Sequence, residues 1–308
     1  MYILIAFLLD IVFGDPEGMV HPVRGMGRWI EFVYKKITAL PQDRQRAAGI
    51  VAAFGSVFGA FFLVQVLLLL LPAPLDGILS VYLLYTSLAA KNLAEEAMAV
   101  HRALEESLEA ARRQLSRIVG RETAALKREE VICAVVETVS ENTSDGVIAP
   151  LLYAFLFGPA GAVAYKMANT LDSMVGYRNE TYRDAGYGAA KLDDILNWIP
   201  ARLTVAVMAI STGSGFAMVR AFKSAKRYGR NHLSPNAGYP ESAAAGILGI
   251  RLGGGHYYFG EYVEKPYIGE AVRTPTTDDI VNAVGLLWRS SLLFMLIGHV
   301  LYWIVRGI

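Results

Sequence analysis

Charged residues are scarce in this chain of 308 residues, and neither sign of charge is in excess. They make up 19% of the sequence, against 54% hydrophobic residues, and the mean hydropathy is +0.36. This composition is too apolar for an ordinary soluble protein. The formal net charge of +1 provides no general basic field, so we expect no nucleic-acid partner.

The sequence also lacks several groups that commonly carry a function. Its single cysteine, Cys133, excludes an intrachain disulfide and lies in the apolar run VICAVV, where a buried inert thiol is the simpler interpretation. No His/Cys cluster indicates zinc, and without a G-x-x-x-x-G-K-[ST] motif a nucleotide would need a site other than a P-loop. The apolar segment 1–13 has no basic flank or A-x-A cleavage site, which favours a short membrane helix over a signal peptide.

Long apolar runs are what the sequence does contain. Segment 47–71 has no charged residue and is long enough to cross about 30 Å of hydrocarbon, and 286–305 is a second candidate span. Segment 78–90 is apolar but short. We therefore expect an all-α, polytopic integral membrane protein that forms a single domain over residues 1–308.

Two further apolar runs, 147–165 and 203–216, are interrupted by proline or glycine. Such segments are typical of broken or re-entrant helices that line a cavity. The loop after the first segment is rich in Lys and Arg, whereas 72–77 has neither, so the positive-inside rule places that loop in the cytoplasm. Full spans at 147–165 and 203–216 would put basic residues outside, so we expect both runs to be non-spanning or half-spanning.

One amphipathic cytoplasmic helix is predicted between 92 and 119. Apolar residues recur there at steps of three and four, from Leu93 to Ile118. Glu109 and Arg113 form a pair four residues apart on its polar face, and Gly120 is the expected C-terminal stop.

Polar groups crowd the border of these apolar runs, where ionisable side chains need partners, water or ligands. In ETVSENTSDG, Glu137 and Glu141 lie four residues apart and repel on a helix unless a cation lies between them. Asp145 follows, and the set suits a divalent cation bound through carboxylates and phosphate oxygens. A helix C-terminus followed by an Asx turn is the alternative.

The motif GDPEGMVHPVRGMG carries Asp15, His21 and Arg24. These residues either line a pocket, with Arg24 facing a carboxylate or phosphate, or serve only as a capping Asp and a surface His.

Two more motifs are polar on one helical face. YKMANTLDSMVGY places Lys166, Asn169 and Asp172 at three-residue steps, and Lys166 either neutralises an anionic phosphate or snorkels to lipid headgroups. KLDDILNWIPARLT places paired aspartates and Asn197 within one turn, which is a familiar Mg²⁺–phosphate arrangement or, alternatively, helix capping.

The last motif is SPNAGYPESAAAGILGIRLGGG. Pro240 fits the first position of a small-faced helix, and Asn236 with nearby backbone amides could hold an anion at its N-terminus. Gly253 to Gly255 form a flexible hinge or a place of close backbone approach.

Together these motifs resemble the adenosylcobinamide-phosphate synthase family (CobD/CbiB) of cobalamin biosynthesis, over nearly the whole chain and in the family's order. The resemblance implies a membrane ligase that joins the free carboxylate of adenosylcobyric acid to aminopropanol, as its O-phosphate, using ATP and Mg²⁺. The implied partners are these small molecules and the lipid bilayer, with a homo-oligomer possible. The implied location is the cell membrane, with a pocket facing the cytoplasm and built from loops near 14–46, 137–146, 165–202 and 229–256. A polytopic transporter and an AmpE-type membrane sensor or scaffold are the alternatives.

Under this resemblance the expected site residues fall into three groups. The candidate catalytic residues are Glu141, Asp145, Lys166 and Asp172. The candidate substrate-binding residues are Asp15, His21, Arg24, Asn142, Asn169, Arg202, Asn236 and Glu241. The candidate metal ligands are Asp193, Asp194 and Asn197.

Overall fold

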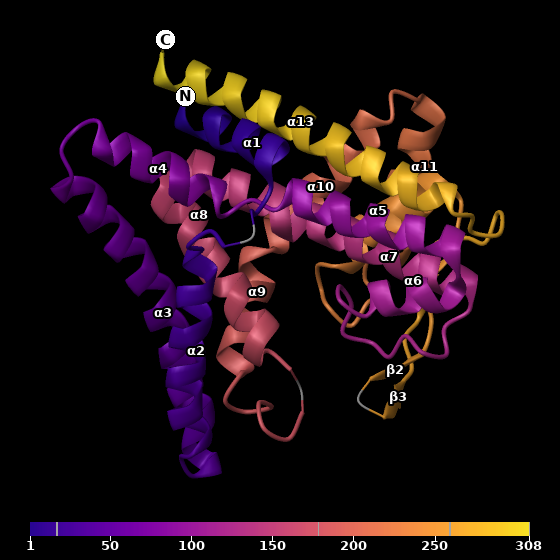
Figure 1. Ribbon diagram of the computed structural model, residues 1–308, viewed down its shortest axis with the longest axis horizontal. Helices are drawn as coiled ribbons and strands as arrows, with labels where there is room; N and C mark the ends of the chain where they lie inside the picture. Colours follow the sequence, from indigo (N-terminus) through magenta and orange to yellow (C-terminus); the bar gives the residue numbers. More distant parts are fainter. Residues whose placement is uncertain (17, 178, 259, 308) are drawn as a thin grey trace. The chain divides into compact units, whose positions relative to one another are not determined.

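The computed structural model describes residues 1–16, 18–177, 179–258 and 260–307 (Figure 1). The helices of the first half are α1 (Tyr2–Phe13), α2 (Pro22–Thr38), α3 (Gln42–Leu70), α4 (Leu75–Tyr85), α5 (Ala90–Glu106), α6 (Leu108–Leu115) and α7 (Arg128–Thr143). After a π-helical turn at Ser144–Ile148 come α8 (Ala149–Val175), α9 (Tyr187–Leu196), α10 (Trp198–Ser211), α11 (Gly215–Tyr228), α12 (Gly238–Leu248) and α13 (Asp278–Arg306). The short strands are β1 (Leu252–Gly253), β2 (His256–Tyr258), β3 (Glu261–Val263) and β4 (Tyr267–Ile268).

The architecture confirms the all-α membrane class. Three helical stretches of the described chain are long and apolar enough to cross a membrane, namely Gln42–Leu70, Arg128–Val175 and Asp278–Val305. The strands form only two small antiparallel pairs, in which Leu252 pairs with Ile268 and His256 with Val263.

Helix α8 is broken, as its sequence predicts. Gly158 has φ 67° and ψ −158° inside the helix, and Pro159 follows it. Glycine tolerates a positive φ, and proline offers no N–H to continue the ladder, so the pair interrupts the apolar run 147–165. The run 203–216 is broken too, because α10 ends at Ser211 and the Ser214 side chain caps α11. Whether either run crosses only half of the bilayer stays a prediction.

The amphipathic segment is helical, with different boundaries from those expected. It forms two helices, α5 and α6, because the Ser107 side chain accepts a hydrogen bond from the N–H of Ala110 and starts a new helix there. The second helix ends at Leu115 rather than near Gly120. The apolar face is buried as predicted, with Val100 and Leu104 among its buried residues.

Backbone contacts group the chain into two compact units. Unit 1 comprises Met1–Ala89, Ala149–Asn197 and Gly298–Ile308, and unit 2 comprises Ala90–Ile148 and Trp198–Ile297. The single domain expected from the sequence stays a prediction, and the two units are described separately below.

Unit 1 has its main core among α2, α3, α8 and α9. Small residues let these backbones approach closely. A Cβ atom on Gly49 of α3 would lie 1.9 Å from the carbonyl oxygen of Ala185, and one on Gly188 of α9 would lie 2.5 Å from the Cα of Ile50. Glycine is therefore required at the contact between α3 and the start of α9, as at other close helix contacts in membranes.

In unit 2, α12 is the central helix and contacts α7, α10 and α11. Its Ala243, Ala244 and Ala245 are buried, and Gly246 allows α11 to approach, because a Cβ there would lie 2.6 Å from the carbonyl oxygen of Arg220. Gly249, with φ 73°, ends α12 in a left-handed cap and starts the segment that carries β1 to β4.

The glycine contact of unit 1 predicts opposite outcomes for two changes in the same helix. Gly49→Ala forces the backbones apart and should lower the free energy of unfolding by about 1–3 kcal/mol. Gly55→Ala is the matched control, because nothing lies within 4 Å of a Cβ at that position, and alanine should there be neutral or stabilising by up to about 1 kcal/mol. Thermal unfolding of the detergent-solubilised protein measures both, and equal melting temperatures for the two variants would contradict the close approach.

Candidate functional site

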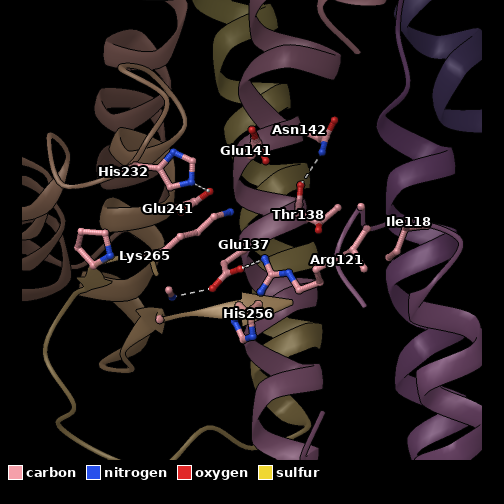
Figure 2. Close-up of a pocket in the computed structure, with 15 residues that line it drawn as sticks. Ile118, Arg121, Glu137, Thr138, Glu141, Asn142, His232, Glu241, His256 and Lys265 are labelled. Atoms are coloured by element: carbon pink, nitrogen blue, oxygen red, sulfur yellow. Dashed lines mark hydrogen bonds and ion pairs between the residues drawn. The ribbon is translucent and has the colours of Figure 1, made fainter. Parts of the chain in front are cut away.

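A polar cavity of about 220 Å³ lies within unit 2 (Figure 2). Its walls come from α7, the loop before α7, the loop before α12, α12 itself and the segment of β1 to β4. The lining residues are Ile118, Val119, Gly120, Arg121, Glu137, Thr138, Glu141, Asn142, His232, Glu241, Gly253, Gly254, His256, Lys265 and Pro266.

A buried ion pair forms the base of this cavity. Arg121 donates to Glu137 Oε2, and the two side chains are only 10% and 7% exposed. The other carboxylate oxygen, Oε1, accepts the backbone N–H of Gly253 at 2.7 Å. Glu137 therefore connects α7 to the loop before it and to the segment after α12, and Arg121 provides a cation beside Glu137.

Glu141 and Asn142 line the cavity one turn further along α7. Asn142 Nδ2 donates to the carbonyl oxygen of Thr138 at 2.9 Å. Asp145 does not line the cavity, since it lies beyond the end of α7 in the π-helical turn. π-helical turns inside long helices are frequently found at functional sites, and here the turn follows the cavity residues directly.

Glu241 and His232 face each other on the wall opposite α7 (Figure 2). His232 Nε2 lies 3.9 Å from Glu241 Oε1, while its Nδ1 accepts the N–H of Ser234 at 3.0 Å. Burial lowers the pKa of His232 to about 4, so the ring is neutral at pH 7 and the contact is not an ion pair. Burial, together with the carboxylates of Glu137 and Glu141, raises the pKa of Glu241 well above its usual range.

The third wall is the segment that follows α12. Gly253 and Gly254 have φ 78° and 94°, and the N–H of Gly253 can point at Glu137 because glycine adopts this backbone conformation freely. His256 and Lys265 come from the same segment, and Figure 2 shows the Lys265 side chain extending into the cavity. Burial, and then the charge of Arg121, lowers the pKa of His256. The cavity thus combines two cations, three carboxyl groups and two histidines.

Two other predicted residues of unit 2 bind each other outside this cavity. Arg202 donates to Asn236 Oδ1 at 2.6 Å and to the carbonyl oxygen of Pro235 at 3.2 Å, and its guanidinium stacks 3.9 Å from the ring centre of Tyr239. These contacts fasten α10 to the loop before α12. The geometry therefore favours a structural role for both residues, and substrate binding by them stays a prediction.

The predicted metal residues lie in unit 1, where they have protein partners. Asn197 Nδ2 donates to Asp193 Oδ2 at 2.9 Å, and Asn197 Oδ1 accepts the hydroxyl of Tyr165 at 2.8 Å. Asp194 pairs with Lys191 at 2.7 Å. In the described ranges of the chain, no three or more His, Cys, Asp or Glu residues are grouped so that they could hold a metal ion. Metal binding by these residues stays a prediction.

The remaining predicted residues are also in unit 1. His21 Nε2 lies 3.4 Å from Asp15 Oδ1, and His21 Nδ1 accepts the N–H of Val23, so this histidine caps α2. Arg24 is exposed. Lys166, Asn169 and Asp172 are half-buried along the second part of α8, as their common spacing predicts. That these residues of unit 1 share one pocket with the predicted residues of unit 2 stays a prediction.

Comparison with known proteins decides the family. The CobD/Cbib protein family matches residues 3–287. The chain is 42% identical to the cobalamin biosynthesis protein CobD of Klebsiella pneumoniae, over 98% of this chain and 97% of the relative. It is 42% identical to CbiB of Salmonella typhi, over 94% and 93%, and 40% identical to CobD of Clostridium perfringens, over 99% of each. The chain belongs to the CobD/CbiB family.

No solved structure matches this CobD/CbiB protein. Its geometry adds four ionisable cavity residues that were not selected from the sequence, namely Arg121, His232, His256 and Lys265. The unmet need for a cation near Glu137 and Glu141 was the only sequence signal for Arg121 or Lys265. His232 precedes the motif that starts α12, and His256 follows the glycines at 253–255. No spacing in the sequence indicates that the two histidines line one cavity.

The buried ion pair predicts a strong and non-additive effect on stability. Arg121→Ala leaves the charge of Glu137 buried without compensation and should lower the free energy of unfolding by about 3–5 kcal/mol. The double variant Arg121→Met/Glu137→Met removes both charges and should be less destabilised than Arg121→Ala. Denaturant unfolding of the detergent-solubilised protein measures both, and a double variant at least as destabilised as Arg121→Ala would contradict the coupling of the pair.

The neutral histidine predicts a pH dependence of stability. The pKa of His232 is lower in the folded protein than its ordinary value near 6.5. Its stabilising contribution is therefore complete above about pH 6.5 and is lost as the pH falls through about 4, by at most about 3 kcal/mol. His232→Gln should flatten this part of the stability profile. His101→Gln, on α5, is the control and should leave the slope unchanged, and an unchanged slope in His232→Gln would contradict the burial of a neutral ring.

Proposed function

We propose that this CobD/CbiB protein is an adenosylcobinamide-phosphate synthase, an ATP-dependent ligase. It joins the free carboxylate of adenosylcobyric acid to the amine of aminopropanol O-phosphate. The observation that carries the proposal is the match over nearly the whole chain to curated proteins named for cobalamin biosynthesis. The cavity supports it, because acidic, basic and imidazole groups are gathered there in a largely buried site.

The reaction sets clear chemical requirements. A carboxylate is a poor electrophile, and hydroxide is a poor leaving group. Transfer of a phosphoryl group from ATP to the carboxylate gives an acyl phosphate and ADP, and the amine then attacks the acyl carbon while inorganic phosphate leaves. The protein must therefore balance phosphate charges, accept protons from the attacking nitrogen and exclude water.

The cavity residues can meet the first two requirements. Lys265 is a compact point charge in the cavity and would face a phosphate oxygen of the amine substrate or of the acyl phosphate. Glu241 would accept the proton released by the nitrogen, because its raised pKa brings a carboxyl group closer to neutral pH, where a general base works best. His232 would orient Glu241 through its Nε2 atom.

The volume of the cavity limits what it can enclose. At about 220 Å³ it is smaller than the usual range of about 300–1,000 Å³ for pockets that enclose a small molecule. We infer that it receives only the reacting groups, namely the carboxylate arm, the amino alcohol phosphate and the phosphoryl group transferred from ATP. The corrin ring would remain outside.

ATP and Mg²⁺ belong to this proposal as co-substrate and cofactor. Mg²⁺ in phosphoryl-transfer sites commonly takes one or two protein carboxylates and completes its shell with phosphate oxygens and water. Glu141 offers such a carboxylate in the cavity, and Asp193, Asp194 and Asn197 offer a second donor set in unit 1. A bound ion would screen phosphate charge, and the protein groups would position the substrates.

We further propose that the enzyme is a multi-pass protein of the cell membrane whose site faces the cytoplasm. The excess of Lys and Arg in the motif-bearing loops supports this orientation. A transporter should show inverted repeats, which the sequence does not contain.

Amide formation by the purified protein tests the function. The full chain in detergent or in lipid nanodiscs is incubated with adenosylcobyric acid, ATP, Mg²⁺ and aminopropanol phosphate, and the amide product is identified by mass. Omission of ATP or of the amine should abolish the product. Failure to form any amide with a folded protein would overturn the ligase assignment.

Lys265→Gln should lower kcat/KM for the amide-forming reaction by about 10- to 100-fold. A hydrogen bond to a charged group contributes about 1.5–3 kcal/mol, and about 1.4 kcal/mol corresponds to a factor of ten. Lys36→Gln, an exposed lysine on α2, is the control and should keep near-normal activity. Near-normal turnover by Lys265→Gln would remove this lysine from the proposed site.

A further inference from the structure

Helix α11 has two chemically different exposed ends. Residues 215–222 expose large apolar side chains, with Phe216 74%, Val219 46% and Phe222 45% exposed. Its C-terminal half exposes Lys223, Lys226 and Arg227. The preceding helix α10 adds an exposed Ile210 near the turn between the two helices. Ile210, Phe216, Val219 and Phe222 are called the apolar end of α11 below.

The opposite face of α11 is fixed by its contact with α12. Ala221, Ser224 and Ala225 are buried there. The helices are so close that a Cβ atom on Gly246 would lie 2.7 Å from the Cβ of Ser224. The helix cannot turn its apolar row inward without losing this contact.

The cations of α11 line a cavity of about 490 Å³. Arg220, Lys223, Lys226 and Arg227 face it, and Glu270 is the one acidic residue among its lining residues. Glu270 bonds Arg227 at 2.8 Å. In the described part of the chain, Lys223 and Lys226 have no acidic partner, so the cavity keeps a net positive charge.

We propose that α11 is an interfacial helix that inserts its apolar end into the bilayer and binds the phosphate of an anionic phospholipid headgroup in the cavity lined by Arg220, Lys223, Lys226 and Arg227. Two observations select the membrane as the occupant. The chain contains helices that can span a bilayer, so lipid is always next to this protein. The pairing of an exposed apolar row with a cluster of cations is also the combination that holds helices at anionic membrane surfaces.

The length of the helix fits this arrangement. Phe216 and Lys226 are ten residues apart, which corresponds to about 15 Å along the helix axis. Phe216 can thus reach the boundary of the acyl chains while Lys226 remains among the headgroups, and long basic side chains adjust their depth by snorkelling. The lining residues of this cavity are distinct from those of the cavity around Glu137, so the lipid site goes beyond the proposed ligase function.

Lipid binding by the full chain tests the proposal. Native mass spectrometry of the detergent-solubilised protein, titrated with phosphatidylglycerol or with zwitterionic phosphatidylcholine, gives the affinity for each. Phosphatidylglycerol should bind the wild type more tightly. Lys223→Gln/Lys226→Gln should weaken its binding by about tenfold and leave phosphatidylcholine binding unchanged, and the loss should shrink at high ionic strength.

Two variants serve as controls. Arg113→Gln/Arg117→Gln removes the same charge from exposed arginines that already pair with Glu109 and Glu96, and it should change phosphatidylglycerol binding by less than twofold. Lys223→Arg/Lys226→Arg keeps the charge and should retain binding. Equal losses in the glutamine variant and the Arg113/Arg117 control, or loss in the arginine variant, would overturn the site. Displacement of phosphatidylglycerol by inorganic phosphate would show a site for soluble anions and would overturn the lipid assignment.

Insertion of the apolar end has its own readout. Phe222→Trp, in protein reconstituted with brominated lipids, should add quenchable tryptophan fluorescence. Arg113→Trp on α6 should add fluorescence that the lipids do not quench. Equal quenching of both added residues would overturn the interfacial position of α11.

Discussion

Burial of Glu137 is the constraint on which the polar cavity of unit 2 depends. Glu137 is only 5% exposed. A carboxylate buried to this extent is costly unless it is both paired with a cation and hydrogen-bonded. Arg121 provides the pairing charge, and Gly253 donates its backbone N–H. Both the loop before α7 and the segment after α12 therefore contact α7 through Glu137. Lys265 and His256, which lie in that second segment, line the same cavity.

The cavity has an uneven distribution of charge. Arg121 is paired with Glu137, whereas Glu241 lies beside a neutral histidine and near other carboxylates. Glu137 is therefore anchored by an ion pair and a backbone hydrogen bond, while burial and the neighbouring carboxylates raise the pKa of Glu241. The same low-dielectric surroundings produce both effects, because they strengthen a paired charge and penalise an unpaired one.

Small residues allow the backbones of neighbouring helices to pack closely. Gly49 and Gly188 in unit 1, and Gly246 with the alanines of α12 in unit 2, allow helices to touch through their main chains. This close packing directs large apolar side chains outward, as at Phe58 and Phe62 on α3 and at Phe216 on α11. The exposure of these side chains agrees with the high hydrophobic content of the sequence.

The sequence alone determined the all-α membrane class, the break at Gly158–Pro159, the burial of the apolar face of 92–119 and the family. Each of these depends on local rules, such as hydropathy over a window, proline and glycine geometry, helical periodicity, or a long ordered set of motifs. It also selected Glu141, Asn142 and Glu241, which line the cavity. Only the tertiary structure decided that Arg121 pairs with Glu137, that His232 faces Glu241, and that Arg202 and Asn236 bind each other. The reason is physical: a charged side chain is satisfied by whichever group the fold brings within about 3–4 Å, and residues 16 or 116 positions apart, such as Arg121 or Gly253 relative to Glu137, carry no local signal of that proximity.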